Sequence, residues 1–151
     1  MNTLEKLIAL FERFPGIGPR QARRFVSHLL TLERSQTEEL SKLILRIKDE
    51  ATECSQCFRF FAKNGGGSKC DICSDTERDA SLLMVLERDH DITPIERSGT
   101  YRGYYFVLGG SVPLLNIEAI EKLRGGILKA TFPKRIEAGL KEVILAFSVN
   151  P

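Results

Sequence analysis

The chain has 151 residues, a length that suits one ordinary domain or two small ones that share a core. Hydrophobic residues make up 42% and charged residues 28% of the sequence, which excludes an intrinsically disordered chain. The formal net charge is only +2, so a surface that binds nucleic acid must be a local patch of positive charge.

The first predicted elements are two helices joined by a glycine turn. Apolar residues at helical spacing lead into the turn, and Pro15 and Gly16 are expected to end the first helix. Gly16 and Gly18 permit tight or left-handed backbone, and Pro19 suits the first turn of the second helix. The segment therefore predicts a helical hairpin.

The start of the second helix carries a cluster of positive charge, formed by Arg20, Arg23 and Arg24. Free N–H groups at a helix N-terminus attract anions, so the arginines together with Gly16 and Gly18 predict a phosphate site. The pattern resembles the helix-hairpin-helix of non-specific DNA-binding proteins. The alternative is an ordinary helix turn whose arginines are merely solvated.

A third helix is expected after the hairpin. Ser35 followed by Glu38 has the spacing of a capping box, which places the start of the helix there. Its apolar positions share one face, which we expect to close over the first two helices: Leu40, Leu43, Ile44 and Ile47. We assign residues 1–53 to a helix-hairpin-helix DNA-binding domain.

All four cysteines of the chain lie in two Cys-x-x-Cys pairs, Cys54 with Cys57 and Cys70 with Cys73. Two such pairs with glycine-rich turn material between them predict one structural zinc ion per chain, held by four thiolates in residues 54–76. A closed shell leaves no position for water or substrate. The alternatives are two disulfides, which no secretory signal supports, or a redox dithiol, which needs only one pair.

Residues 77–151 show strands alternating with helices. Such alternation predicts a parallel sheet with helices packed on it. The expected strands cover residues 81–87, 104–108 and 142–147, and the expected helices cover residues 89–97, residues 117–128 and a short segment after Pro133. The fold class is therefore α+β in several parts, and the third strand is expected to leave an apolar edge or face exposed.

A third motif is the segment from Glu96 to Gly110, ERSGTYRGYYFVLGG. The hairpin, the cysteine pairs and this segment succeed one another and together extend over most of the chain. In this order the three motifs resemble the RecR family of bacterial recombination mediators. The resemblance implies a Toprim fold for residues 77–151, DNA binding by the hairpin arginines, and ring-shaped tetramers. It also implies partnership with RecO, and in some bacteria RecF, in loading recombinase onto gapped DNA. Family members continue further, so we expect a truncated or shortened relative.

Catalysis in Toprim enzymes requires a glutamate after the first strand and an acidic pair after the third, which together bind magnesium. Glu87 occupies the first place, but the sequence from Ser148 to Pro151 offers no carboxylate at the second. We therefore expect no enzyme activity. Glu87 is either a partner contact or an exposed strand-end acid.

Three tyrosines alternate around Gly103, namely Tyr101, Tyr104 and Tyr105. They either stack on bases or, as strand aromatics usually do, pack the sheet and an interface. Tyr104 is our candidate for a contact with a partner protein.

These observations favour a non-enzymatic adaptor that binds DNA without sequence preference. The alternatives are a zinc-stapled protein-interaction module that does not bind DNA, and a Toprim nuclease or topoisomerase fragment. The sequence has no signal-peptide pattern and no apolar run that would span a bilayer, so we expect a cytoplasmic, nucleoid-associated protein without a membrane partner.

Overall fold

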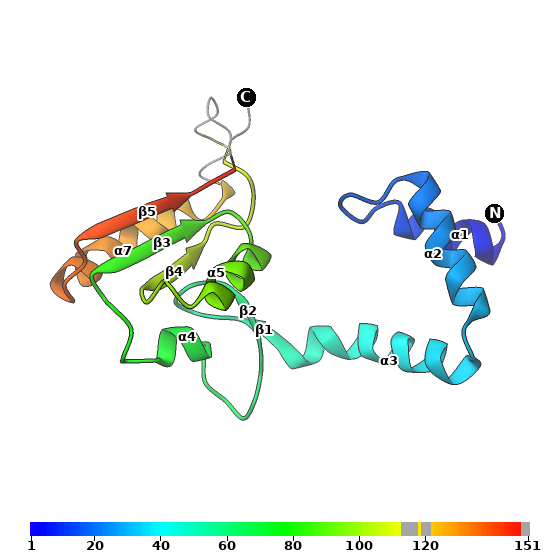
Figure 1. Ribbon diagram of the computed structural model, residues 1–151, viewed down its shortest axis with the longest axis horizontal. Coiled ribbons are helices and arrows are strands. Elements are labelled where there is room, and N and C mark those ends of the chain that lie inside the picture. The colour runs from blue at the N-terminus through cyan, green and yellow to red at the C-terminus, as the bar shows by residue number, and fades with distance from the viewer. Residues whose placement is uncertain (113–117, 119–121, 149–151) are drawn as a thin grey trace. The chain divides into compact units, whose positions relative to one another are not determined.

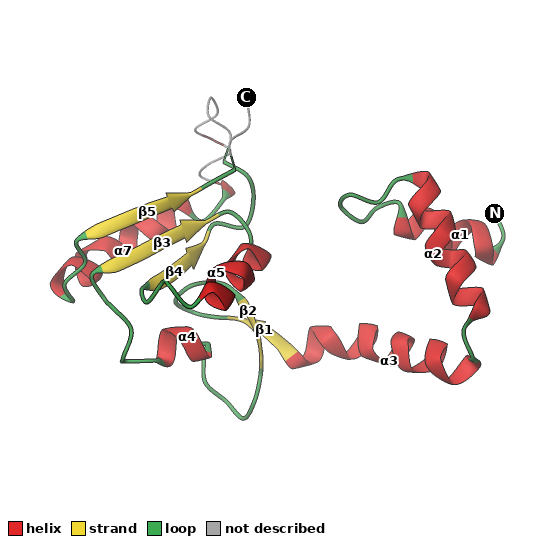
Figure 2. Ribbon diagram, in the orientation of Figure 1, coloured by secondary structure: helices red, strands yellow, loops and turns green. Residues whose placement is uncertain are grey.

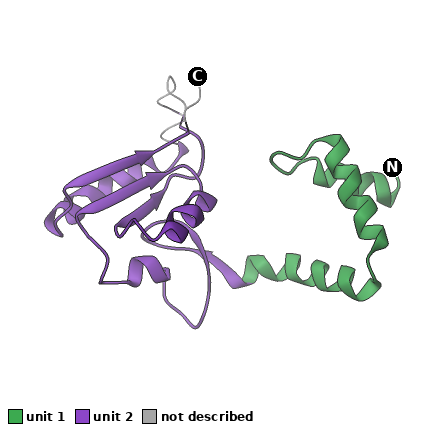
Figure 3. Cartoon of the chain, in the orientation of Figure 1, with its two compact units in different colours: residues 1–49 green, residues 50–151 purple. Residues whose placement is uncertain are grey.

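A computed structural model describes residues 1–112, 118 and 122–148. The chain forms two compact units, Met1–Asp49 and Glu50–Pro151, shown in different colours in Figure 3. The segment that carries the cysteines belongs to the same unit as the parallel sheet. Each unit is described by itself below.

The first unit begins with the predicted helical hairpin. Helix α1 spans Thr3–Phe11, and its N-terminus is capped by Asn2, whose side chain accepts a hydrogen bond from the Glu5 N–H at 2.9 Å. Helix α2 spans Pro19–Thr31 and packs against α1 with Ala22 and Val26 buried (Figure 1). The prediction of two helices around a glycine turn is confirmed, although α1 ends at Phe11, before the proline.

Helix α3 spans Arg34–Glu50 and departs from two expectations. The helix begins before Ser35, and the Gln36 side chain accepts from the Glu33 N–H at 3.0 Å, so the expected capping box is wrong. The expected cover over the first two helices is also wrong, because α3 buries no residue. Its apolar stripe is 40% to 62% exposed: Leu40, Leu43, Ile44 and Ile47.

The second unit begins with small elements that the apolar periodicity does not reveal. Strands β1 (Ala51–Glu53) and β2 (Phe60–Ala62) pair antiparallel, and helix α4 (Asp71–Ser74) follows. Each is at most four residues long, too short for a sequence period to appear. Arg124 connects this segment to the sheet by donating to the Val107 carbonyl and to the Glu53 carboxylate.

Three parallel strands form the sheet, as predicted. Strands β3 (Leu82–Leu86), β4 (Tyr104–Val107) and β5 (Glu142–Ala146) lie in the order β4-β3-β5 (Figure 2). The turn η1 (Asp89–Asp91) and helix α5 (Ile92–Ser98) occupy the helical segment expected between β3 and β4. Helix α5 ends at Gly99, whose φ of 67° lies in the left-handed region that glycine adopts without strain.

Helix α7 (Gly125–Glu137) covers one sheet face and α5 the other (Figure 1). Residues 117 and 119–121 of the helix expected over 117–128 lie outside the described residues, and α7 begins only at Gly125. No separate helix follows Pro133, which is inside α7 instead. Pro133 is exposed to solvent and lacks the N–H that would bond the Lys129 carbonyl.

Side chains alternate between the two faces of β3, as the period of a strand requires. Leu83 and Val85 pack with Phe106 and Leu128, whereas Met84 and Leu86 pack on the other face with the four cysteines. The cysteine segment therefore shares a core with the sheet. Strand β5 is at the sheet edge, where Leu145 is 64% exposed, in agreement with the expected apolar edge. Among the described residues, no helix is long and apolar enough to cross a membrane.

Candidate metal centre and nucleic-acid interface

The two Cys-x-x-Cys pairs meet at one point. Cys54 and Cys57 follow β1, and Cys70 and Cys73 belong to the first turn of α4. All four side chains are buried, none forms a disulfide, and their sulfurs lie within 4.8 Å of one another. The arrangement is that of a binding site for one metal ion.

The spacing of the sulfurs fits a tetrahedral thiolate shell. Bonds of about 2.3 Å from zinc to sulfur place two sulfurs about 3.8 Å apart, and the sulfurs of Cys57 and Cys70 are 3.7 Å apart. Backbone N–H groups point at the sulfurs: those of Gln56 and Cys70 donate to Cys54, and that of Cys73 donates to Cys70, at 3.3 to 3.4 Å. These donors stabilise negative charge on sulfur.

The cluster needs a cation to hold four thiolates. Hydrogen bonding with Cys57 and Cys70, and then burial, raise the pKa of the Cys73 thiol. Thiolates so close together repel one another, so all four ionise only when a metal ion balances their charge. A bound metal therefore stabilises the folded segment directly.

The metal centre is anchored to the sheet. The Val107 N–H donates to the Cys57 carbonyl at 2.8 Å, which joins the first cysteine pair to β4. Phe58, next in the chain, packs edge-on against Phe106, with ring centroids 5.5 Å apart. Loss of the metal is thus expected to disturb one face of the sheet as well as the cysteine segment.

The hairpin turn places a bare helix N-terminus at the surface of the first unit. Gly16 has φ of 77°, in the left-handed region that favours glycine. Gly18 is the N-cap of α2 and provides no capping side chain, while Pro19 takes the first helical position. The N–H groups of the first turn are therefore open to an anion.

The predicted arginines gather beside this N-terminus. Arg20, Arg23 and Arg24 are exposed and, with Pro19 and Ser27, line an open hollow of about 650 Å³. Its lining contains no carboxylate. Arg20 lies three residues before Arg23 and four before Arg24, so on the helix surface it neighbours both.

Glu87 follows β3 but is not an exposed acid, so that expectation is wrong. The side chain is 4% exposed, and its carboxylate accepts hydrogen bonds from the N–H and the hydroxyl of Ser148 after β5. Burial by itself raises the pKa of this carboxyl, but the hydrogen bonds from Ser148, Ser111 and Val112 together outweigh burial and hold the pKa below its usual range. Across residues 1–112, 118 and 122–148, no second group of three or more acidic, histidine or cysteine side chains is placed to hold a metal.

The hydroxyls of the three tyrosines bond within the protein, which agrees with the expectation that these residues pack the sheet. Tyr105 is buried, and its hydroxyl donates to Glu96 at 2.7 Å. The hydroxyl of Tyr101 donates to the Tyr104 carbonyl, and that of Tyr104 to the Asp75 carbonyl, both at 2.7 Å. Tyr104 is half-buried, and its proposed contact with a partner stays a prediction.

Sequence reasoning missed an ion pair that connects the segment after α4 to helix α5. The guanidinium of Arg78 forms a two-point contact with the Glu96 carboxylate and donates to the Gly103 carbonyl at 3.1 Å. The two residues are 18 positions apart, so no helical or strand spacing signals the pair. Arg78 and Tyr105 together outweigh the effect of burial, which alone raises the pKa of Glu96, and the net result is a lowered pKa.

Comparison with known proteins gives one consistent result. A family model described as "RecR, helix-hairpin-helix" matches residues 4–48. The chain is 38% identical over 150 residues to "Recombination protein RecR" of Rubrobacter xylanophilus, covering 99% of the chain and 71% of that relative. It is 34% identical to the protein of the same name from Mycobacterium leprae and 37% identical to that from Moorella thermoacetica, with 97% of the chain covered in both cases and 71% and 70% of the relatives.

Proposed function

Because the chain belongs to the RecR family of recombination proteins, we propose that it binds DNA without sequence preference through the α1–α2 hairpin. In this role it acts as a mediator that helps to load recombinase onto gapped DNA. The protein works as an adaptor in DNA repair and carries out no chemical step of its own. The metal ion and the sheet hold the second unit and its proposed partner contacts in place.

The observation that carries the proposal is the cluster of Arg20, Arg23 and Arg24 beside the uncapped start of α2. Three positive charges in one hollow stand out in a chain whose net charge is only +2. Guanidinium groups and N–H groups bind phosphate oxygens, which are the same in every DNA sequence. Nonspecific complexes of this kind have dissociation constants of about 1 to 100 μM.

The proposed metal is zinc, held by Cys54, Cys57, Cys70 and Cys73. Four cysteine ligands with no open position are typical of structural zinc sites in proteins. When bound, the ion supplies charge balance and cross-links β1 to α4, and it takes no part in a reaction. Side chains of the sheet bury the four cysteines and keep water away from the metal site.

The proposed partners are DNA, RecO, in some bacteria RecF, and further copies of the chain in a ring. Glu87 and Tyr104 are the proposed contacts for partner proteins. Support for Glu87 comes from its position at an open hollow of about 490 Å³ that polar and apolar side chains line, where its buried carboxylate would act by holding Ser148. Support for association comes from the exposed Leu145 on the edge strand β5. The proposed location is the cytoplasm, with the DNA.

The experiment is a binding titration of the full chain on two duplexes of unrelated sequence. The double variant Arg23→Ala and Arg24→Ala removes two charges from the hollow, whereas Lys42→Ala with Lys48→Ala removes two exposed charges from α3. Since each charge-assisted hydrogen bond contributes about 1.5 to 3 kcal/mol, we expect the arginine variant to bind both duplexes at least about tenfold more weakly. The lysine variant should bind as the unchanged chain does.

Two results contradict the proposal. Equal binding by the arginine variant would move the DNA contact away from the hairpin. A loss on only one duplex would mean base recognition, which phosphate contacts cannot produce. If the unchanged chain binds no DNA even at low salt, the alternative of a zinc-stapled protein-interaction module is favoured instead.

A further inference from the structure

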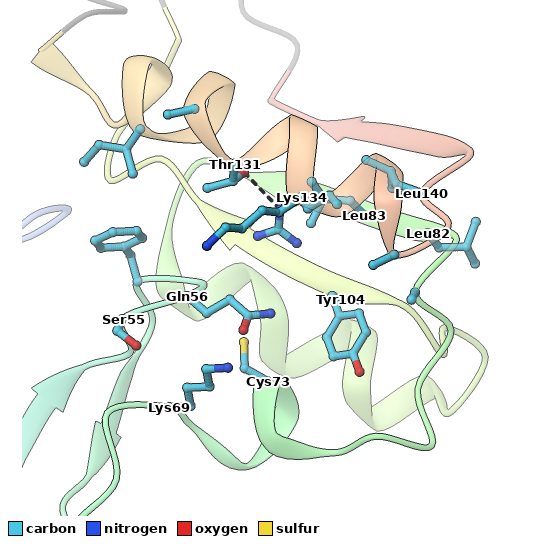
Figure 4. Close-up of a pocket in the computed structure, with 16 residues that line it drawn as sticks. Ser55, Gln56, Lys69, Cys73, Leu82, Leu83, Tyr104, Thr131, Lys134 and Leu140 are labelled. Carbon is cyan, nitrogen blue, oxygen red and sulfur yellow. Dashed lines mark hydrogen bonds between the residues drawn. The ribbon is translucent and has the colours of Figure 1, made fainter.

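A second cationic hollow lies in the other unit, far along the sequence from the hairpin arginines. It has a volume of about 700 Å³ and is walled by α7, the start of β3 and the cysteine segment (Figure 4). Pockets of roughly 300 to 1,000 Å³ are typical of sites for small organic ligands. The proposed DNA contact does not use this space, and the metal centre borders it only through Cys73.

The charged side chains in this pocket are all positive. Lys134 reaches it from α7, and Lys69 reaches it from the cysteine segment (Figure 4). Arg135 of α7 also lines the pocket. Its lining contains no aspartate or glutamate. Three like charges in one concave site repel one another, and a bound anion relieves that repulsion.

Arg135 is the most constrained of the three cations. The side chain is half-buried, and its Nε–H donates to the Thr131 hydroxyl at 3.0 Å, which fixes the direction of the guanidinium. The Thr131 hydroxyl in turn donates to the Leu128 carbonyl at 2.7 Å. Within the described part of the chain, Arg135 forms no ion pair with a carboxylate. An oriented guanidinium without a carboxylate partner is suited to phosphate.

The remaining wall of the pocket is apolar and aromatic. Leu82, Leu83 and Ile127 line it together with the ring of Tyr104, whose hydroxyl is held by the Asp75 carbonyl. A bare ion would leave this wall exposed to water. A ligand that joins an anionic group to a flat, largely apolar body would cover it.

We propose that this pocket binds a nucleotide unit, with its phosphate on Lys134 and Arg135 and its base against Leu82 and Tyr104. A phosphate monoester carries a charge of about −1.5 to −2 and three acceptor oxygens, which match several converging cations better than a single carboxylate does. The nucleotide is either free, as this monoester, or part of a DNA strand, where each phosphate is a diester with a single negative charge. The site extends the proposed function without depending on it, because the hairpin belongs to the other unit.

A competing role for the cations is charge balance at the metal centre. Cys73 lines the same pocket, and a divalent ion with four thiolates is net negative. If Lys69, Lys134 and Arg135 serve only this purpose, the metal-loaded protein has no affinity for nucleotides. The two roles are therefore separated by binding measurements on the metal-loaded chain.

The test uses the full metal-loaded chain with Arg23→Ala and Arg24→Ala, so that the hairpin contributes little. Calorimetry measures binding of thymidine 5′-monophosphate, a thymidine oligonucleotide, inorganic phosphate and an oligoglutamate peptide. Lys134→Glu and Arg135→Gln alter the pocket, whereas Lys129→Glu changes the charge of an exposed lysine of α7 outside the pocket. We expect the pocket variants to bind at least about tenfold more weakly and Lys129→Glu to bind within about twofold of the parent.

Binding of the mononucleotide that depends on Lys134 supports a free ligand. Binding of the oligonucleotide alone, with the same dependence, supports a DNA strand as the source. Inorganic phosphate or oligoglutamate binding as tightly as the nucleotide would overturn the proposal, as would no binding at all. If the Arg135→Gln variant fails to fold, the Lys134→Glu variant still tests nucleotide binding, because Lys134 is exposed and its replacement does not disturb the core.

Discussion

Replacement of Glu96 by glutamine tests whether its ion pair with Arg78, which joins the segment after α4 to helix α5, stabilises the second unit. The substitution keeps the shape of the side chain but removes the negative charge opposite Arg78. The Arg78 side chain is 13% exposed and that of Glu96 is 27% exposed, so neither charge is fully solvated. Tyr105 also donates to Glu96, and its hydroxyl can still donate to the glutamine oxygen.

The expected loss lies between two limits. Breaking a fully buried ion pair costs about 3 to 5 kcal/mol, whereas a solvent-exposed pair contributes about 0 to 1 kcal/mol. For this partly buried pair we expect the free energy of unfolding to fall by about 2 kcal/mol, an intermediate value. For a unit of about a hundred residues, that loss lowers Tm by roughly 10 °C.

The assay is thermal unfolding of the zinc-loaded chain at pH 7, followed by near-ultraviolet circular dichroism. The chain has no tryptophan, and its three tyrosines are in the second unit, so the signal reports that unit. Glu77→Gln is the matched control, because Glu77 is exposed and surface substitutions change stability by less than about 0.5 kcal/mol. If Glu96→Gln unfolds at the same temperature as this control, the ion pair does not stabilise the fold.

The pH dependence gives a second check. The pKa of Glu96 is lower in the folded protein than in the unfolded chain, so its contribution is fully present above the unfolded pKa of about 4.3. That contribution is lost as the pH falls through the folded pKa. The difference between the unchanged chain and Glu96→Gln should thus be constant from pH 8 to about 6 and shrink below about 4. Acid also releases the metal, but it does so in both proteins.

Three further predictions concern the metal, a close contact and the sheet edge. Metal analysis should find one zinc ion per chain, and a chelator or Cys73→Ser should lower Tm; a zinc-free chain of unchanged Tm would contradict the metal site. Gly103→Ala should cost about 1 to 3 kcal/mol in urea unfolding, because a Cβ there would lie 2.6 Å from the Cβ of Leu82. Gly126→Ala in α7 is its control, with nothing within 4 Å, and equal stabilities would refute the packing argument. Leu145→Lys on the exposed edge of β5 should reduce self-association in sedimentation, and a chain that is monomeric before the change would refute it.

Much of the fold could be predicted because its signals are local. The hairpin turn and the cysteine pairs each place their residues within a few positions of one another, and the apolar runs of β3 and β4 fit buried parallel strands. The parallel pairing of the three strands also follows the expectation for alternating strands and helices.

The failures have physical reasons as well. The apolar period of α3 shows that the helix has an apolar face, but it does not say what covers that face, and within the described chain the face is exposed. Pro133 was expected to precede a helix, yet a long helix tolerates one missing hydrogen bond at its solvent-exposed side. The burial of Glu87 depends on Ser148, which lies 61 residues away and approaches only when β5 joins the sheet.

The central claim, that the hairpin arginines hold DNA phosphates, is tested most directly by the salt dependence of binding. Affinity for duplex DNA should fall by about 0.9 log unit per log unit of salt for each phosphate contact. If Arg23 and Arg24 each hold one phosphate, their replacement by alanine should flatten the slope by about 2, whereas Lys42→Ala with Lys48→Ala should leave it unchanged. Equal slopes for the unchanged chain and the arginine variant would contradict the claim.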